Sequence, residues 1–121
     1  MSIFSNINED KFIHRSHSFF MIYDSYPVSP GHILIISKEE KIDFFSLSSE
    51  EKAELSAQID LAKAIIEEDN RPDGYNIGMN CGEASGQTVM HFHCHVIPRY
   101  LGDMENPRGG VRHCVKGKGY Y

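Results

Sequence analysis

Three histidines within five residues are the feature that most constrains how this chain can fold. His91, His93 and His95 alternate with apolar residues, which is the period-two pattern of a β-strand. The pattern predicts a strand over residues 86–98, with a row of imidazoles facing outward and apolar side chains facing a core. Neighbouring imidazoles in such a row lie about 6.5–7 Å apart, which is twice the rise per strand residue.

A row of imidazoles fits more than one kind of site. A His-x-His pair on a strand can supply two metal ligands, although residues 86–98 contain no aspartate or glutamate to complete the set. One neutral imidazole can instead attack an electrophile while its neighbours handle charge and protons. The rings can also be purely structural, satisfied by hydrogen bonds. The three histidines alone leave these alternatives open.

Length, charge and cysteine content narrow the class of protein. The 121 residues predict one domain, and the net charge of −5 argues against a surface that neutralises nucleic-acid phosphates. No apolar run reaches the roughly 20 residues that span a bilayer, and no secretory signal opens the chain. The three cysteines are scattered and predict free thiols in a reducing compartment. We therefore expect a cytoplasmic protein with no nucleic-acid or membrane partner.

The motif resembles that of a known family. The run His91-Phe92-His93-Cys94-His95-Val96-Ile97 is similar to the signature of the histidine triad (HIT) nucleotide hydrolases and transferases. The resemblance extends to Pro30-Gly31-His32 and to Gly86-Gln87-Thr88-Val89, and it covers nearly the whole chain. It implies an α+β fold, with an antiparallel sheet of about five strands and one long helix packed across it. It also implies a homodimer that binds a nucleotide or dinucleotide substrate.

The remaining elements are expected from local patterns. A Ser-x-x-Glu capping box at Ser48 and Glu51 predicts the start of the long helix, and Pro72 prevents its continuation. Glycines in 74–80 predict close approach of another backbone or a ligand. We expect a single domain over residues 1–121, in which residues 102–121 form a glycine-rich basic tail that is either mobile or phosphate-binding. The expected strands cover residues 12–15, 19–24, 32–37 and 74–80, the last two central, and a helical turn covers residues 2–7.

The resemblance implies roles for four histidines. His93 is the expected nucleophile, which attacks the α-phosphorus of a nucleoside phosphate and forms a nucleotidyl-histidine. His95 is expected to stabilise or protonate the leaving group. His91 and His32 are expected to orient and charge-balance the row. This scheme requires no metal or other cofactor, although a divalent ion could accompany a polyphosphate substrate.

The resemblance also implies a nucleoside site. Its members are Asp24, Asn80, Gln87, Thr88, Ile3, Phe4, Ile7, Ile22 and Tyr23. Asp24 is expected to bind the ribose hydroxyls, although an aspartate there also suits a turn. Asn80 and Gln87 either hold phosphate oxygens or only brace a loop. The apolar members either form a wall for the base or simply pack in the core.

One departure from the family pattern and one resemblance to a branch of the family affect the expected chemistry. Many relatives carry a Cys-x-x-Cys zinc half-site where this chain has Ser2 and Ser5, so we predict no structural zinc. Pro98-Arg99 resembles the diadenosine-polyphosphate hydrolase branch, which is similar to fragile histidine triad proteins, more than the phosphoramidase branch. A dinucleoside polyphosphate is therefore the favoured substrate. The alternatives are a purine nucleoside phosphoramidase and a nucleotide-binding adaptor with little turnover.

Overall fold

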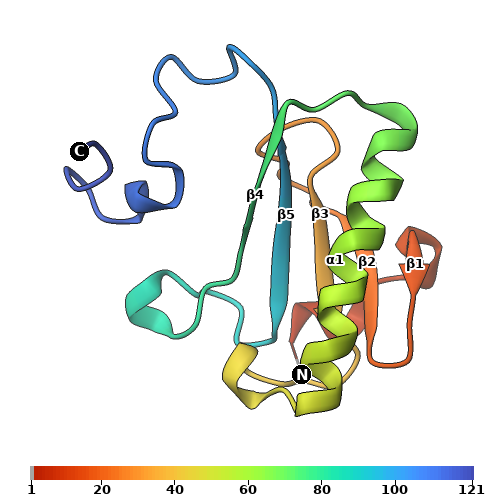
Figure 1. The fold of residues 1–121 in the computed structure, drawn as a ribbon. Coiled ribbons are helices and arrows are strands. Elements are labelled where there is room, and N and C mark those ends of the chain that lie inside the picture. Colours follow the sequence, from red (N-terminus) through yellow and green to blue (C-terminus); the bar gives the residue numbers. More distant parts are fainter. Residues whose placement is uncertain (1) are drawn as a thin grey trace.

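The computed structural model describes residues 2–121 and contains one antiparallel sheet with a single α-helix across it (Figure 1). The strand order is β1-β2-β3-β5-β4, and every neighbouring pair is antiparallel. The predicted α+β architecture is confirmed. Within residues 2–121 no helix has the length and apolar character needed to cross a bilayer. The bounds are β1 His14–Arg15, β2 Phe19–Tyr23, β3 Ile33–Ser37, α1 Ser49–Asp69, β4 Gly74–Gly78 and β5 His93–Arg99.

The two faces of the sheet are covered by different parts of the chain. Alternate side chains of β2, β3 and β5 point toward α1 and build the larger core with its buried residues, namely Phe19, Met21, Ile33, Ile35, Cys94, Val96, Leu55, Ala62 and Ile66. The opposite face holds a smaller cluster that the N-terminal segment covers, made of Phe20, Ile22, Leu34 and Ile36 with Phe4, Ile7 and Phe12. His93 and His95 alternate with the buried Cys94 and Val96, so they lie on this second face.

The long helix begins as the sequence predicts. The Ser48 hydroxyl accepts a hydrogen bond from the Glu51 N–H at 3.1 Å, and the Glu51 carboxylate accepts one from the Ser48 N–H at 2.7 Å. Such a cap contributes about 0.5–2 kcal/mol. The Ser-x-x-Glu prediction is confirmed, and so is the helical turn in 2–7, where a 3₁₀ turn covers Ile3–Asn6.

Two expectations about the strands are wrong. β4 is an edge strand rather than a central one, because it pairs only with β5. A Cβ added to Gly74 or Gly78 would meet open space, so neither glycine marks the close approach of another backbone, and the alternative of a ligand at these glycines stays a prediction. β5 begins at His93 rather than near residue 86, because the chain before it leaves the sheet. The N–H of Phe92 donates to the carbonyl of Lys41, at 2.6 Å, in the loop that follows β3.

Candidate active site

β5 brings His93 and His95 together on the sheet face that the helix does not cover. His93 lies opposite Ile36 and His95 opposite Leu34 in the β3–β5 register. Their ring centroids are 5.4 Å apart, and both side chains are partly exposed. The sequence prediction of an outward row is therefore confirmed for these two histidines.

The prediction is wrong for His91, which is fully buried. Its Nε2 lies 2.7 Å from the carbonyl oxygen of Ser37, and its Nδ1 lies 2.5 Å from the hydroxyl of Ser2. A carbonyl can only accept, so Nε2 carries the proton and Nδ1 accepts from the serine hydroxyl. Both ring nitrogens are satisfied by protein groups, which explains why the ring can lie inside the protein.

His93 has a single tautomer that its own neighbourhood sets. Its Nδ1 lies 2.9 Å from the carbonyl oxygen of His91, and this nitrogen must therefore donate. The proton on Nδ1 leaves Nε2 with a free lone pair. The ring of Phe4 packs edge-on against His93, with centroids 5.0 Å apart, and limits its rotation. The buried His91 thus acts on His93 through its backbone rather than through its ring.

His32 and His95 form a hydrogen-bonded pair with a defined direction. The N–H of Val28 donates to Nδ1 of His32 at 3.1 Å, so the proton of His32 is on Nε2. That Nε2 lies 2.9 Å from Nδ1 of His95 and 3.4 Å from a carboxylate oxygen of Asp24. Nδ1 of His95 accepts this bond, which leaves the proton of His95 on Nε2. The outer nitrogen of His95 is therefore a hydrogen-bond donor.

The loop before β3 fixes the position of His32. Gly31 has a φ of +94°, and a Cβ there would lie 3.1 Å from the Asn70 side chain and 3.3 Å from Ile66 at the end of α1. A larger residue would both strain the backbone and crowd the helix. The Pro-Gly-His motif therefore sets the close packing that leaves His32 buried beside His95.

Burial keeps both members of this pair uncharged. It lowers the pKa of His95 to about 4, with the nearby His32 and His93 acting in the same direction and Asp24 opposing them. Burial also lowers the pKa of His32, and the Asp24 carboxylate opposes this shift. Both rings are therefore neutral at physiological pH.

The same residues are the one potential metal-binding group within residues 2–121. Ligand atoms of Asp24, His32 and His95 lie within 4.8 Å of one another. Nε2 of His32 and Nδ1 of His95 are already bonded to each other, and Nδ1 of His32 accepts from Val28. A metal ion at this position would have to displace the proton that joins the two rings. The three side chains therefore fit a chain of hydrogen bonds better than they fit a metal site.

We expect the lowered histidine pKa values to make the protein less stable in mild acid. An unfolded histidine has a pKa of about 6.5, whereas that of His95 in the folded chain is about 4. Between these values the unfolded chain binds more protons, so the free energy of unfolding falls as the pH falls through this window. Urea unfolding at about pH 7 and about pH 5 measures the effect. A His95→Asn variant should lose less stability between the two pH values, and an equal loss would contradict this explanation.

A pocket of about 390 Å³ opens beside the two exposed histidines. It brings together most of the residues predicted for the nucleoside: Ile3, Phe4, Ile7, Ile22, Asp24 and Thr88, along with His93 and His95. Asp24 also forms the alternative turn, because one carboxylate oxygen accepts from the N–H of Tyr26 at 2.9 Å. Its other oxygen faces His32. The pocket has an apolar floor and one carboxylate at its edge, which suits a base and a ribose.

Three predicted residues lie elsewhere. The Gln87 amide is buried and braces its loop, accepting from the Gly82 N–H and donating to the carbonyls of Ile42 and Val89. Tyr23 lies beside a different cavity. Asn80 lies with His95 in a larger groove on the other side of the histidine pair.

Sequence reasoning also missed several contributors, among them the pocket-lining residues Ser25, Tyr26 and Val89. Leu34 lines the pocket opposite His95, which only the β3–β5 register reveals. Ser2 bonds the ring of His91, a contact between residues 89 positions apart that no local pattern indicates.

Comparison with known proteins identifies the family. The model of the HIT domain matches residues 5–102 of this chain. The chain belongs to the HIT family. It is 34% identical over 90 residues to a Mycobacterium tuberculosis protein named AP-4-A phosphorylase, covering 74% of this chain and 46% of that protein. It is 34% identical over 87 residues to a bis(5'-adenosyl)-triphosphatase of Dictyostelium discoideum, covering 72% of this chain and 58% of that protein. The chain thus spans about half the length of these curated relatives.

Solved structures share the HIT fold. A HIT family protein from Bacillus anthracis has a TM-score of 0.72 and 33% identity, covering 77% of this chain and 66% of that one. A zinc-bound histidine triad family protein from Mycobacterium smegmatis has a TM-score of 0.69 and 36% identity, covering 78% of this chain and 69% of that one. The sheet and the helix are therefore those of the family.

Ser2 is the centre of a hydrogen-bonded cluster at the position that the family resemblance associates with a zinc half-site. The Ser2 N–H donates to the Glu40 carboxylate at 2.8 Å, while the Ser2 hydroxyl donates to His91 and accepts from the N–H of Phe4. Hydrogen bonds from Ser5 and Ser2 lower the pKa of Glu40. Serine hydroxyls are not the thiolate or imidazole ligands that structural zinc prefers, so this cluster does not fit such an ion. It holds Phe4 against His93 instead.

Proposed function

We propose that this chain is a nucleotide hydrolase that cleaves dinucleoside polyphosphates through a covalent intermediate on His93. The observation that carries the proposal is the tautomer of His93. Its Nδ1 proton is held by the carbonyl of His91 at 2.9 Å, and Nε2 keeps a lone pair beside the nucleoside pocket. A neutral imidazole with this orientation is a competent nucleophile without an added base.

The reaction proceeds in two displacements at the α-phosphorus. Nε2 of His93 forms a bond to phosphorus while the bond from phosphorus to the bridging oxygen breaks, and the remaining nucleoside polyphosphate leaves. Water then attacks the phosphorus, the P–N bond breaks, and one proton goes to solvent as the nucleoside monophosphate is released. The imidazole keeps its Nδ1 proton throughout, and the phosphoryl oxygens offset the positive charge that the ring acquires.

The neutral form of His95 favours cleavage of an anhydride bond in the substrate over cleavage of a P–N bond. A polyphosphate can leave as an anion and needs only a hydrogen-bond donor such as Nε2–H of His95. An amine must be protonated as it leaves, and a neutral imidazole is not an acid that can do this. Because the pKa of His95 is lowered to about 4, its charged form is scarce near neutral pH. This supports a dinucleoside polyphosphate over a phosphoramidate.

The names of the relatives support the same substrate class. Both AP-4-A phosphorylase and bis(5'-adenosyl)-triphosphatase are named for diadenosine polyphosphates. A phosphorylase passes the nucleotidyl group to phosphate rather than water, so the acceptor has to be tested as well. We also propose that the protein is a homodimer, as its family resemblance implies, and that it acts in the cytoplasm, for which its scattered cysteines are suited.

A panel of substrates tests the proposal. Diadenosine tetraphosphate and adenosine 5'-phosphoramidate should be compared at neutral pH, with and without a chelator and with water or phosphate as acceptor. We expect kcat/KM for the dinucleotide to exceed that for the phosphoramidate by at least about tenfold, and chelation to leave it largely unchanged. Faster turnover of the phosphoramidate would refute the anhydride assignment. Turnover of neither substrate would refute the hydrolase itself.

A further inference from the structure

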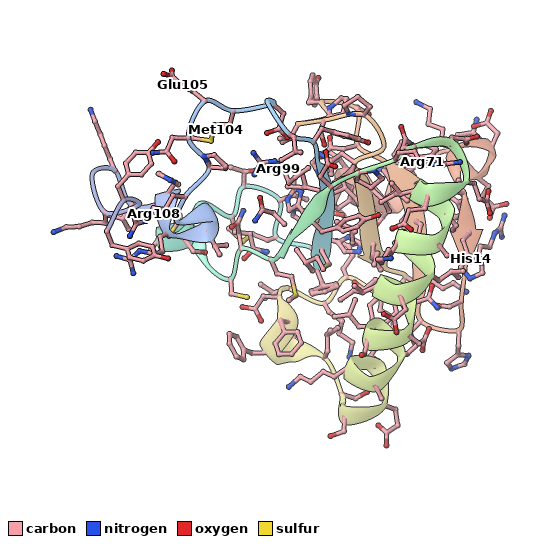
Figure 2. The ribbon with its side chains drawn as sticks, turned by 45° about the horizontal axis from the view of Figure 1, so that its top comes forward. His14, Arg71, Arg99, Met104, Glu105 and Arg108 are labelled. Atoms are coloured by element: carbon pink, nitrogen blue, oxygen red, sulfur yellow. The ribbon has the colours of Figure 1, made fainter. Side chains whose placement is uncertain are left out.

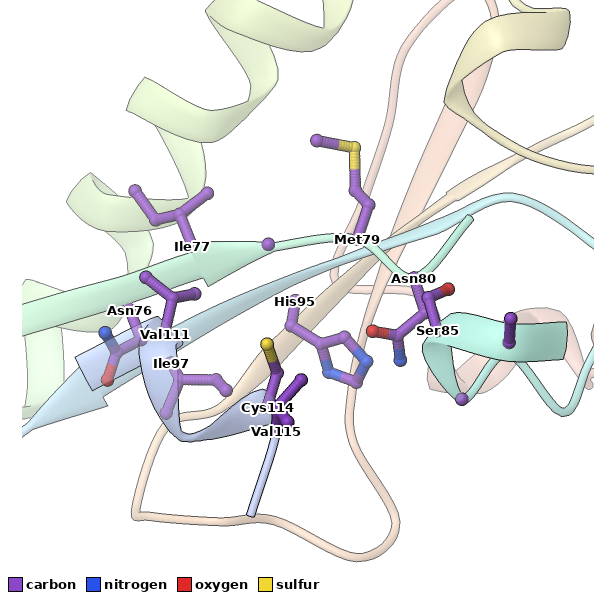
Figure 3. Close-up of a pocket in the computed structure, with 13 residues that line it drawn as sticks. Asn76, Ile77, Met79, Asn80, Ser85, His95, Ile97, Val111, Cys114 and Val115 are labelled. Atoms are coloured by element: carbon purple, nitrogen blue, oxygen red, sulfur yellow. The ribbon is translucent and has the colours of Figure 1, made fainter. Parts of the chain in front are cut away.

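His95 lies between the nucleoside pocket and a second, larger groove. This groove has a volume of about 830 Å³ and runs between the β4–β5 edge of the sheet and the C-terminal tail. Figure 3 shows the His95 ring in the middle of the lining residues, with Asn80 and Ser85 on one side and Cys114 and Val115 on the other. The donor nitrogen inferred for the leaving group thus belongs to a residue that lines both cavities.

The tail that forms one wall of the groove is a folded segment. The Tyr120 hydroxyl donates to the carbonyl of Asn106 at 3.0 Å, and Nε2 of His113 donates to the carbonyl of Arg108 at 2.9 Å. Gly119 is buried within this loop, and a Cβ there would overlap the ring of His113. The tail therefore has a definite path beside the sheet, visible as the blue segment to the left of β4 in Figure 1.

The walls of the groove match the parts of a nucleotide. Apolar side chains from the sheet and from the tail face the cavity, namely Ile97, Val111 and Val115, and these can pack on a base (Figure 3). Asn76, Asn80 and Ser85 add uncharged hydrogen-bonding groups for a ribose or phosphate.

The tail supplies positive charge to a chain that is otherwise acidic. Residues 106–121 contain four cationic side chains and no acidic one, although the whole chain has a net charge of −5. Arg108 and Arg112 both lie over the ring of Tyr121, at 4.7 and 5.0 Å from its centroid, so two of these cations are held together. By contrast, Arg99 at the end of β5, which Figure 2 labels, is engaged by Asp103 and Asn76. None of the four cationic side chains lines the groove itself, so they act by adding positive charge to the tail that forms one of its walls, which favours an anionic ligand there.

We propose that this groove binds the leaving group of the reaction, the second nucleoside of a dinucleoside polyphosphate with its phosphates. The inference rests on the proposed function. The nucleoside pocket holds the adenylyl part that is transferred to His93. The departing polyphosphate keeps the electron pair of the broken P–O bond, accepts a hydrogen bond from Nε2 of His95, and extends toward the tail.

Filling the groove separates this proposal from the hydrolase proposal. A Val111→Trp variant should lower kcat/KM for diadenosine tetraphosphate by about tenfold, mainly through KM. The same variant should keep its rate with adenosine 5'-phosphorofluoridate within about twofold, because fluoride needs no groove. The matched control is Leu101→Trp, at a position that is 87% exposed and does not line the groove. Equal losses on both substrates would overturn the leaving-group site, whereas an unmodified chain that turns over neither substrate would overturn the hydrolase.

Cysteine labelling tests the same site in the unmodified protein. Cys114 lines the groove and is exposed, whereas Cys81 is partly exposed and lies outside the groove. Cys94 is buried, and burial raises the pKa of its thiol to about 12, which keeps it unreactive. A non-hydrolysable α,β-methylene analogue of diadenosine tetraphosphate should slow alkylation of Cys114 at least about fivefold relative to Cys81, and AMP should not. No protection by the analogue would overturn the proposal. So would a Cys114 that is already blocked without ligand and becomes reactive on dilution, because a second copy would then cover the groove.

Discussion

Replacing His93 with alanine should reduce turnover of diadenosine tetraphosphate by at least about a thousandfold. The variant removes the only group in the pocket that presents a free imidazole lone pair to the α-phosphorus. The nucleoside should still bind, because the apolar floor and Asp24 are unchanged. Steady-state kinetics give the loss in kcat, and calorimetric titration with AMP should give a dissociation constant within about threefold of the unmodified protein.

A matched control separates the loss of a nucleophile from the loss of any histidine. His17 is exposed and lies in the turn between β1 and β2, so His17→Ala should keep full activity. If His93→Ala retained more than about a tenth of the original kcat, another group would have to be the nucleophile.

Replacing Phe92 with alanine should lower the free energy of unfolding substantially. Phe92 is 1% exposed and packs edge-on against Phe19 beneath α1, with ring centroids 5.9 Å apart. Removing a fully buried aromatic ring costs about 3–5 kcal/mol, from lost burial and the cavity that remains. Urea unfolding followed by circular dichroism measures the difference.

The same substitution at an exposed phenylalanine is the control. Phe45 is 74% exposed, so Phe45→Ala should change the free energy of unfolding by no more than about 0.5 kcal/mol. A loss below about 1 kcal/mol for Phe92→Ala would show that the core beneath the histidine strand is not packed as described.

Local sequence patterns predict the helices and strands of this fold more reliably than they predict which strands pair with each other. The Ser48–Glu51 capping box and the alternation from His93 to Ile97 are set by neighbouring residues, and both predictions are confirmed. The edge position of β4 depends on which strands meet across the chain, and residues 74–80 carry no signal of that. The period-two pattern also continues back to His91, although the chain there has already turned away to bond the loop after β3.

The candidate site shows the same division between local and long-range information. The Pro30-Gly31-His32 motif correctly indicated that His32 lies beside the triad, since the glycine is needed where the loop packs on α1. The burial of His91 could not be predicted, because the groups that satisfy its ring come from Ser2 and Ser37. The direction of the His32–His95 bond likewise depends on the N–H of Val28, which only the folded loop positions.

The most direct measurement of the mechanism is detection of the nucleotidyl group on the protein during turnover. The protein should be mixed with diadenosine tetraphosphate, quenched within the first turnovers in alkali, where phosphorus–imidazole bonds survive, and its peptides weighed. We predict an adenylyl adduct on the peptide that contains His93, absent from the His93→Ala variant. Continued turnover with no adduct at any time, or an adduct on a different residue, would contradict the assignment of His93 as the nucleophile.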